Sequence, residues 1–302
     1  MSGTTALVAH AATTTRRRSP VQLLRGLARA DFVIGALLVA FWGFCAVFPN
    51  LLTSADPTRI EAGGLTLLSE PRPPGSAHFL LGTDSLGRDF FSRVVHGARV
   101  AMIIAIVPNV LALALATVVG VAAGVIGAKV EFVLMRITEA IMVLPGFLIA
   151  MAVISTFGPS TSVLILVLVG FSWTYTARVI YGETLRIREM LFVEAALSVG
   201  AGRWRIAATH IVPHLRPLLV VYFTMNAAFM VLLEAGLGFL GFGVQPPTPS
   251  WGLMLAEAQD QFFYPWLILV PGLCLASLSI GFYLLGQGIQ NAGRPPETAV
   301  IL

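Results

Sequence analysis

The stretch that decides the fold is VAMIIAIVPNVLALALATVVGVAAGVIGA, residues 100–128, which contains no charged residue. At about 1.5 Å per residue, a helix of this length exceeds the roughly 30 Å hydrocarbon core of a bilayer. Lipid offers the backbone no hydrogen-bond partner, so a spanning segment must satisfy its own amides and carbonyls. Apolar residues run through the stretch without alternation, which is not the pattern of a membrane barrel. The sequence therefore predicts a membrane-spanning helix here.

Five further apolar stretches of the same character flank this one. We expect them to span the membrane at residues 32–55, 140–157, 162–177, 217–233 and 266–289. The composition agrees, because 57% of the residues are hydrophobic and only 11% are charged, whereas about a quarter of a soluble domain is charged. These values exclude a disordered chain and argue against a soluble enzyme. The expected fold is all-α, a polytopic protein of the cell membrane with six transmembrane helices.

Positive charge gives the spans an orientation. If the N-terminus lies inside, fourteen of the 19 Lys and Arg residues fall on the inner side, as the positive-inside rule requires. We therefore expect both termini to be cytoplasmic. The expected organisation is a cytoplasmic tail (1–31), the first span (32–55), an extracellular loop with an amphipathic helix (56–99), a five-span core (100–290) that includes a cytoplasmic loop (178–216), and a cytoplasmic tail (291–302).

No motif for catalysis, metal binding or nucleotide binding fits its surroundings. Lys129 is the only lysine and is followed by valine, so a P-loop is absent. The glycines of 236–241 match a dinucleotide fingerprint, but they follow a span and precede prolines, where no βαβ unit can form. His210 and His214 have helical zinc spacing without further ligands. We expect no enzyme activity, no metal, no cofactor in this chain and no nucleic-acid partner.

The predicted cytoplasmic loop, residues 178–216, is the most informative segment, and at roughly forty residues it is too long for a simple turn. Residues 189–199 favour one short helix and 203–211 favour a second. Gly200 lies between them, where a glycine can adopt positive φ and end the first helix. Such a pair can press against another protein or rest on lipid headgroups. The pattern alone leaves both alternatives open.

The same loop resembles the signature of the permease subunits of ABC importers. That signature is Glu-Ala-Ala, three residues, Gly, nine residues, then Ile-x-Leu-Pro. The chain matches it at Glu194, Ala195, Ala196, Gly200 and Pro213, and departs from it at His210 and Val212. A histidine at position 210 is similar to the dipeptide and oligopeptide branch. Residues 81–99 and 240–252 resemble the C-type subunit of that branch.

This resemblance implies a type I importer (MetI-like) fold that forms half of a translocation pathway for di- or oligopeptides. The implied partners are a second permease subunit in a heterodimer, two ABC ATPase subunits that hold ATP and Mg, an extracellular or periplasmic binding protein, and the lipid bilayer. It assigns contact with the ATPases to Glu194, Ala195, Ala196, Gly200, Arg203 and Pro213. The alternatives are import of nickel or glutathione on the same scaffold, or an ion-coupled secondary transporter. The secondary transporter needs several ionisable residues within spans, for which Glu234 is the only candidate.

Two further expectations concern the outer side. Asp84 and Asp89 can pair with Arg88 and Arg93, and the resemblance extends contact with a binding protein to Asp84, Arg88, Asp89 and Trp251. A helix over residues 90–98 is expected to group its apolar side chains on one face, with Arg93 elsewhere. Glu234 either faces the translocation pathway or has a structural role, and the sequence favours neither.

Overall fold

The computed structural model describes residues 30–76 and 78–293, and these residues fold into helices. In chain order they are α2 (Ala30–Val47), α3 (Pro49–Leu52), α4 (Phe90–Ile126), α5 (Ala128–Val143), α6 (Gly146–Phe157), α7 (Thr161–Arg188), α8 (Leu191–Ser198), α9 (Arg203–Ile206), a π-helical turn η1 (Ala207–Ile211), α10 (Val212–Phe239), α11 (Trp251–Glu257) and α12 (Trp266–Gly293). In the described residues, β-pairing is limited to four isolated bridges, all of them in the segment between α3 and α4. The all-α prediction is confirmed.

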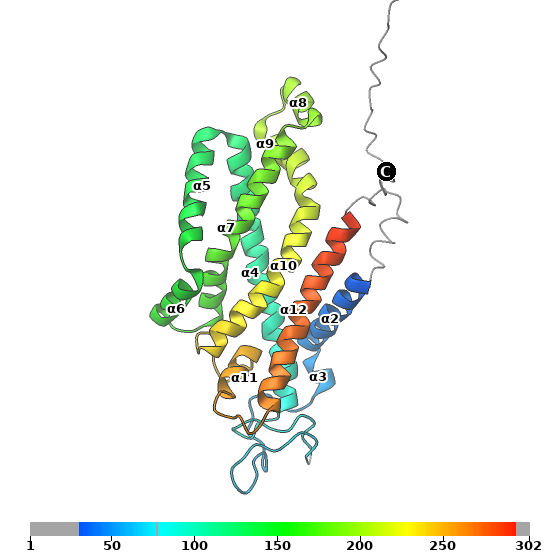
Figure 1. The fold of residues 1–302 in the computed structure, drawn as a ribbon, viewed down its shortest axis with the longest axis vertical. Helices are drawn as coiled ribbons and strands as arrows, with labels where there is room; N and C mark the ends of the chain where they lie inside the picture. Colours follow the sequence, from blue (N-terminus) through cyan, green and yellow to red (C-terminus); the bar gives the residue numbers. More distant parts are fainter. Residues whose placement is uncertain (1–29, 77, 294–302) are drawn as a thin grey trace, which may run out of the picture.

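The bundle has two distinct ends (Figure 1). Five helices, α2, α4, α7, α10 with its preceding turns, and α12, are long and apolar enough to cross a membrane. The bent pair α5 and α6 supplies a sixth crossing if it counts as one span. Successive crossings alternate in direction, so α8 lies at one end of the bundle and the segment between α3 and α4 lies at the other, together with α11 (Figure 1).

The third span, predicted over 140–157 with a kink permitted at Pro145, begins earlier and bends more sharply than expected. α5 begins twelve residues earlier than expected and ends at Val143, and α6 leaves it at an angle of 82°. Leu144, between them, is extended with φ −69° and ψ 137°. Pro145 causes this break, because proline disfavours helical geometry in the residue before it and has no amide to donate.

Two other boundaries also differ from the sequence prediction. The helix expected over 90–98 is not separate from the second span, because α4 runs unbroken from Phe90 to Ile126 and continues through Pro108. The cytoplasmic loop predicted at 178–216 is shorter, because α7 extends to Arg188 and α10 begins at Val212. Polar residues in the added turns ended the apolar runs in the sequence, but they did not end the helices.

Close packing of α4 on α7 holds the centre of the bundle. A Cβ atom added to Gly120 would lie 2.7 Å from the Ala177 carbonyl oxygen, and one added to Gly124 would lie 2.5 Å from Cγ2 of Thr184. Only glycine permits this approach of the two backbones. The spacing of the two glycines therefore predicts a helix contact that the structure contains.

Candidate functional site

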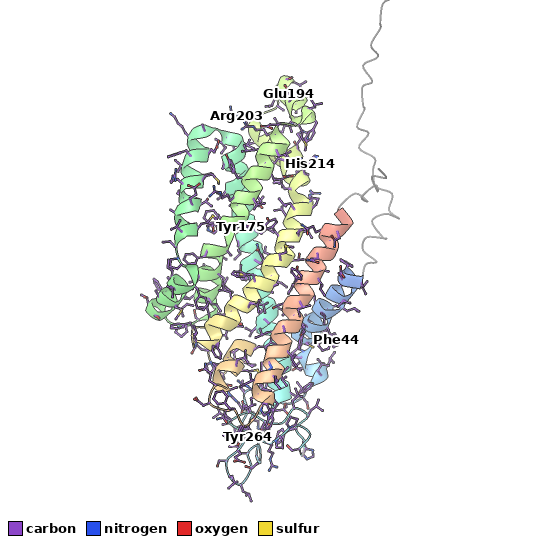
Figure 2. The ribbon with its side chains drawn as sticks, in the orientation of Figure 1. Phe44, Tyr175, Glu194, Arg203, His214 and Tyr264 are labelled. Carbon is purple, nitrogen blue, oxygen red and sulfur yellow. The ribbon has the colours of Figure 1, made fainter. Side chains whose placement is uncertain are left out.

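The short helix α8 protrudes at one end of the bundle, where Glu194 is labelled at its tip (Figures 1 and 2). It ends at Gly200, whose φ of +82° lies in the left-handed region. The Gly200 amide donates to the Leu197 carbonyl at 2.9 Å, and the Ala201 amide donates to the Ala196 carbonyl at 3.1 Å. This bonding pattern closes a helix through a glycine. The predicted role of Gly200 as the end of the first short helix is confirmed.

One buried side chain anchors α8 on the bundle. Among the described residues of this helix Val193 alone is buried, at 0% exposure. It joins an apolar cluster that includes Ile187 of α7, Ile206 of α9 and Leu215 of α10. A helix attached through a single buried residue can move as a unit when something binds its other faces.

Apolar side chains cover much of the outward surface of this end. Leu191, Leu197, Val199 and Trp204 are all exposed, with Val199 at 85%. Glu194 and Ala195 are exposed beside them, and Ala196 is half-buried. A contiguous apolar surface of this kind is typical of a docking site for another protein.

Two arginines tie this end to the carboxyl terminus of α4. The Arg203 guanidinium donates from Nη1 to the Ile126 carbonyl, and that of Arg188 donates from Nη1 to the Gly124 carbonyl at 2.8 Å. The last carbonyls of a helix lack partners within the helix and carry partial negative charge, so cations there stabilise it. A cavity of about 460 Å³ lies beside these contacts, lined by Glu131, Arg188, Val193 and Arg203 among others. The sequence did not single out Arg188, although its position in the last turn of a helix is a usable signal.

The chain continues without a break from α9 into α10. The π-helical turn η1 joins them, and Pro213 lies in the first turn of α10, where proline needs no amide partner. His214 stacks on Phe192 of α8, with ring centroids 4.8 Å apart and an angle of 17° between the rings. In the described ranges 30–76 and 78–293, no three His, Cys, Asp or Glu side chains gather closely enough to hold a metal ion. The two histidines therefore contribute to the α8–α10 contact.

At the opposite end, an ion network joins the segment before α4 to α11. Asp84 accepts from Nε of Arg88 at 2.6 Å, and Nε of Arg93 lies 3.3 Å from the same carboxylate. Glu257 of α11 receives Nη2 of Arg88 at 3.0 Å and Nη2 of Arg93 at 2.7 Å. The predicted pairing of Asp84 is confirmed. No sequence pattern indicated Glu257, because 164 residues separate it from Arg93.

The structure adds to one expectation about this end and contradicts another. Arg93 was expected away from the apolar face of its helix, and its side chain is 0% exposed because it packs between α11 and the segment before α4. Asp89 pairs with neither arginine; it caps α4 by accepting from the Ser92 amide at 2.7 Å. Burial raises the pKa of the Asp89 carboxyl, and the hydrogen bond from Ser92 opposes that shift.

The residues that the resemblance assigned to contact with a binding protein lie inside this end. Asp84, Arg88, Asp89 and Trp251 are all buried. The indole Nε1 of Trp251 donates to the Val94 carbonyl at 3.0 Å. Their contact with a binding protein stays a prediction. In this conformation the four side chains lie beneath the surface and pack against the residues that form it.

Glu234 lies near the end of α10, where the chain turns toward α11. Its side chain is buried, and its Oε1 would lie 3.6 Å from a Cβ added to Gly243. It therefore packs within the subunit and faces none of the cavities described here. Both sequence interpretations of Glu234 stay predictions.

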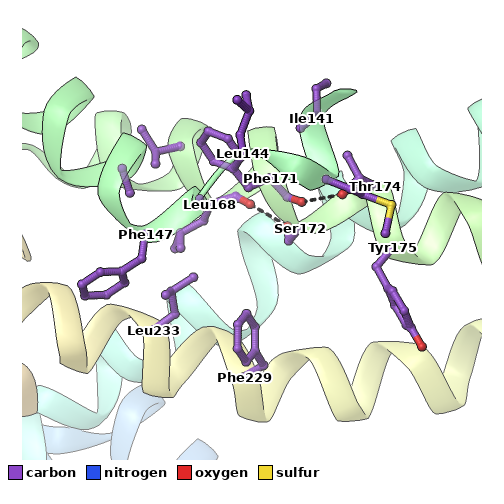
Figure 3. A pocket seen from close by; sticks show the side chains of 14 residues that line it. Ile141, Leu144, Phe147, Leu168, Phe171, Ser172, Thr174, Tyr175, Phe229 and Leu233 are labelled. Carbon is purple, nitrogen blue, oxygen red and sulfur yellow. Dashed lines mark hydrogen bonds between the residues drawn. The ribbon is translucent and has the colours of Figure 1, made fainter. Parts of the chain in front are cut away.

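An apolar cavity of about 330 Å³ lies at the bend between α5 and α6 (Figure 3). Phe147 of α6 borders it at one end and Tyr175 of α7 at the other, with Phe229 and Leu233 of α10 along one side (Figure 3). The cavity exists because the 82° bend carries α6 away from the line of α5. No sequence pattern indicated it.

Comparison with known proteins finds relatives that are all described as components of transport systems. A family model described as "Binding-protein-dependent transport system inner membrane component" matches residues 116–292. The glutathione transport system permease protein GsiD of Pectobacterium atrosepticum is 33% identical over 265 residues, which cover 87% of this chain and 84% of the relative. The oligopeptide transport system permease protein OppC of Mycobacterium tuberculosis is 32% identical over 270 residues, covering 88% and 90% respectively.

Proposed function

This chain belongs to the family of binding-protein-dependent transport system inner membrane components, and from that premise we propose that it forms half of an ATP-driven pathway for di- or oligopeptides. It is a multi-pass permease subunit of the cytoplasmic membrane. We propose a second, different permease subunit as the other half. Two ATPase subunits bind ATP and Mg, and an extracytoplasmic binding protein delivers the cargo.

The observation that carries the proposal is the attachment of α8. Val193 is the one buried residue of the helix and Phe192 adds its stack on His214, while apolar side chains that include Leu191 and Val199 are exposed. This geometry favours a docking surface over the alternative of a helix lying on lipid headgroups. Arg203 projects toward the carboxyl end of α4 instead of outward to phosphates. We therefore assign ATPase contact to the α8 end and propose that this end and both termini are cytoplasmic.

Movement of the ATPases reaches the pathway through the connections of α8. α9, η1 and α10 form one continuous helical path, so a displacement of α8 reorients the long helix that borders the apolar cavity. Arg188 and Arg203 extend the same displacement to α4. Closure of the ATPases would then rock the spans between outward-facing and inward-facing states.

Two rival functions make different predictions. Glutathione import has support from the name of GsiD. One observation supports an ion-coupled carrier. Glu139 lies on α5 and Arg178 on α7, both of them membrane-spanning helices, whereas the sequence analysis expected Glu234 to be the only ionisable candidate. Competition for uptake between dipeptides, longer peptides and glutathione separates the substrates. An ionophore that abolished uptake at constant ATP would favour the carrier.

Crosslinking tests the docking surface directly. The two native cysteines, Cys45 and Cys274, are buried in the bundle, so a cysteine introduced by Ala196→Cys is the reactive one. It should capture a subunit carrying a Walker motif, whereas Ser54→Cys, exposed at the opposite end, should not. Failure of Ala196→Cys to capture any ATPase in membranes that import peptide would overturn the assignment.

A glycine pair tests whether α8 acts as a lever. Gly200 has φ +82°, whereas Gly202 has φ −66°, and a Cβ would meet nothing within 4 Å at either position. Gly200→Ala therefore introduces backbone strain of about 1–2 kcal/mol that Gly202→Ala does not. The first variant should hydrolyse more ATP per peptide imported, and the second should behave as the wild type. Equal coupling ratios in both variants would show that the geometry at the end of α8 does not matter.

A further inference from the structure

Three charged side chains form a triad on the exposed surface of α5 and α7. Arg136 Nη1 lies 2.9 Å from Glu139 Oε2, and Arg178 Nη1 lies 3.3 Å from Glu139 Oε1. The arginine side chains are 66% and 53% exposed, and that of Glu139 is 34% exposed. Two guanidinium groups share one carboxylate, so the triad by itself has a net charge of +1, and Glu131 lies across the adjoining cavity from it.

The triad lies well inside the length of its helices. Arg178 precedes the end of α7 at Arg188 by ten residues, a distance of about 15 Å at 1.5 Å per residue. Glu139 follows the start of α5 at Ala128 by eleven residues, about 16 Å. Exposed charge at this depth is costly against lipid, so such residues face water or a partner. The triad was not predicted from the sequence, because its members lie outside the predicted apolar spans, where loop residues were expected.

Two cavities border the triad and connect it to the pathway. One of about 280 Å³ is lined by all three charged residues together with Glu131 and Tyr181. Another of about 600 Å³ is lined by the three and by Met142, and Met142 also lines the apolar cavity at the α5–α6 bend. A charged cavity and an apolar cavity are therefore adjacent on one face of the subunit.

One exposed polar side chain lies next to the triad on the side of the apolar cavity. Tyr175 precedes Arg178 by three residues, so it lies about one turn away on the same side of α7, and it is exposed at the end of the apolar cavity (Figure 3). The hydrogen bond from Asn226 of α10 to the Thr176 hydroxyl, at 3.2 Å, lies between the helices, because Thr176 is buried. The exposed polar group nearest the triad on this side is therefore Tyr175.

Building on the proposed function, we propose that Arg178 binds the terminal carboxylate of the transported peptide while the adjacent apolar cavity receives a neighbouring apolar side chain. A guanidinium presents paired donors that match a carboxylate. Glu139 holds the Arg178 guanidinium toward the charged cavities and moderates its charge, which lets the cargo leave again. Arg136 occupies the opposite side of Glu139 and holds its carboxylate in place.

Transport of a peptide acid and of its C-terminal amide tests this assignment. The complete importer is placed in vesicles, and the binding protein is saturated with either cargo, so that its own affinity does not affect the rate. Arg178→Gln should lower the acid-to-amide ratio of maximal transport rates about tenfold, the value of a charge-assisted hydrogen bond. Arg178→Lys, which keeps the positive charge, should retain most of the preference. Arg186→Gln is the matched control, because Arg186 is also on α7 and pairs with a glutamate three residues earlier.

The outcomes separate the possible errors. An unchanged ratio in Arg178→Gln overturns the carboxylate site while leaving wild-type peptide import, and hence the proposed function, intact. Absence of ATP-driven peptide import by the wild type would instead refute the proposed function. If neither Arg178 variant assembles with the other subunits, the triad is a structural contact and the proposal is wrong. If the ratio changes only in vesicles with anionic lipid and not in pure phosphatidylcholine, the ligand is a lipid phosphate and the proposal is also wrong.

Discussion

The substitution Val193→Ala removes the one buried contact of α8 without altering its outward surface. It deletes two carbon atoms from a side chain that is 0% exposed, at about 0.8 kcal/mol each. Alanine's higher helix propensity returns roughly 0.5 kcal/mol, and the cavity left behind adds a term of similar size or larger. We therefore expect the docked state of α8 to lose about 1–2 kcal/mol, a factor of roughly 5–30 in its population relative to undocked states.

Hydrogen exchange of the purified permease measures this loss directly. Amides of α8 should exchange roughly 5–30 times faster in Val193→Ala, while those in the centre of α4 should not change. In the complete importer the variant should also transport less peptide for each ATP hydrolysed. Val199→Ala is the matched control, because it makes the same deletion at a side chain that is 85% exposed. Equal exchange rates in the two variants would refute the inference that Val193 docks α8.

Three further predictions concern the rest of the bundle. Glu257→Gln leaves Arg88 and Arg93 without one carboxylate; since Glu257 is 23% exposed, we expect a loss of about 2 kcal/mol rather than the 3–5 of a fully buried pair. The Glu257→Gln variant should therefore be cleaved by protease between α3 and α4 faster than the wild type. Equal cleavage rates in the variant and the wild type would contradict this prediction. Gly120→Ala should destabilise the α4–α7 contact by about 1–3 kcal/mol in thermal unfolding of the complex, whereas Gly170→Ala, where a Cβ meets nothing within 4 Å, should not. Glu234→Gln buries an amide donor in place of a carboxyl and should lower the stability of the assembled complex by about 1–3 kcal/mol; unchanged assembly and uptake would contradict both interpretations of Glu234.

The two ends of the bundle are held together in different ways. The end with α11 is fixed by buried ion pairs that join segments distant in sequence. The end with α8 is attached by one buried apolar side chain, a Phe192–His214 stack and two arginines on helix carbonyls. A rigid platform suits the delivery of cargo from a binding protein, and a weakly attached helix suits the transmission of movement. The difference in attachment thus agrees with the proposed roles of the two ends.

Local chemistry was sufficient to predict much of this protein. Apolar length alone indicates the crossings, because a lipid environment leaves the backbone few alternatives to a helix. Gly200 ends α8 as expected, because only the absence of a Cβ makes positive φ inexpensive. The Asp84–Arg88 pair was also predictable, since the two residues are four positions apart.

Features that depend on distant segments were decided by the tertiary structure. Pro145 indicated a kink, but its 82° angle and the cavity beside it result from how α6 packs against α7. The burial of Arg93 was not predictable from its helix, because Asp84 and Glu257 converge on it from two separate segments. The triad of Arg136, Glu139 and Arg178 forms because α5 and α7 lie side by side. A sequence pattern records the neighbours of a residue along one helix, whereas the free energy of a charge depends on the partners that other helices bring to it.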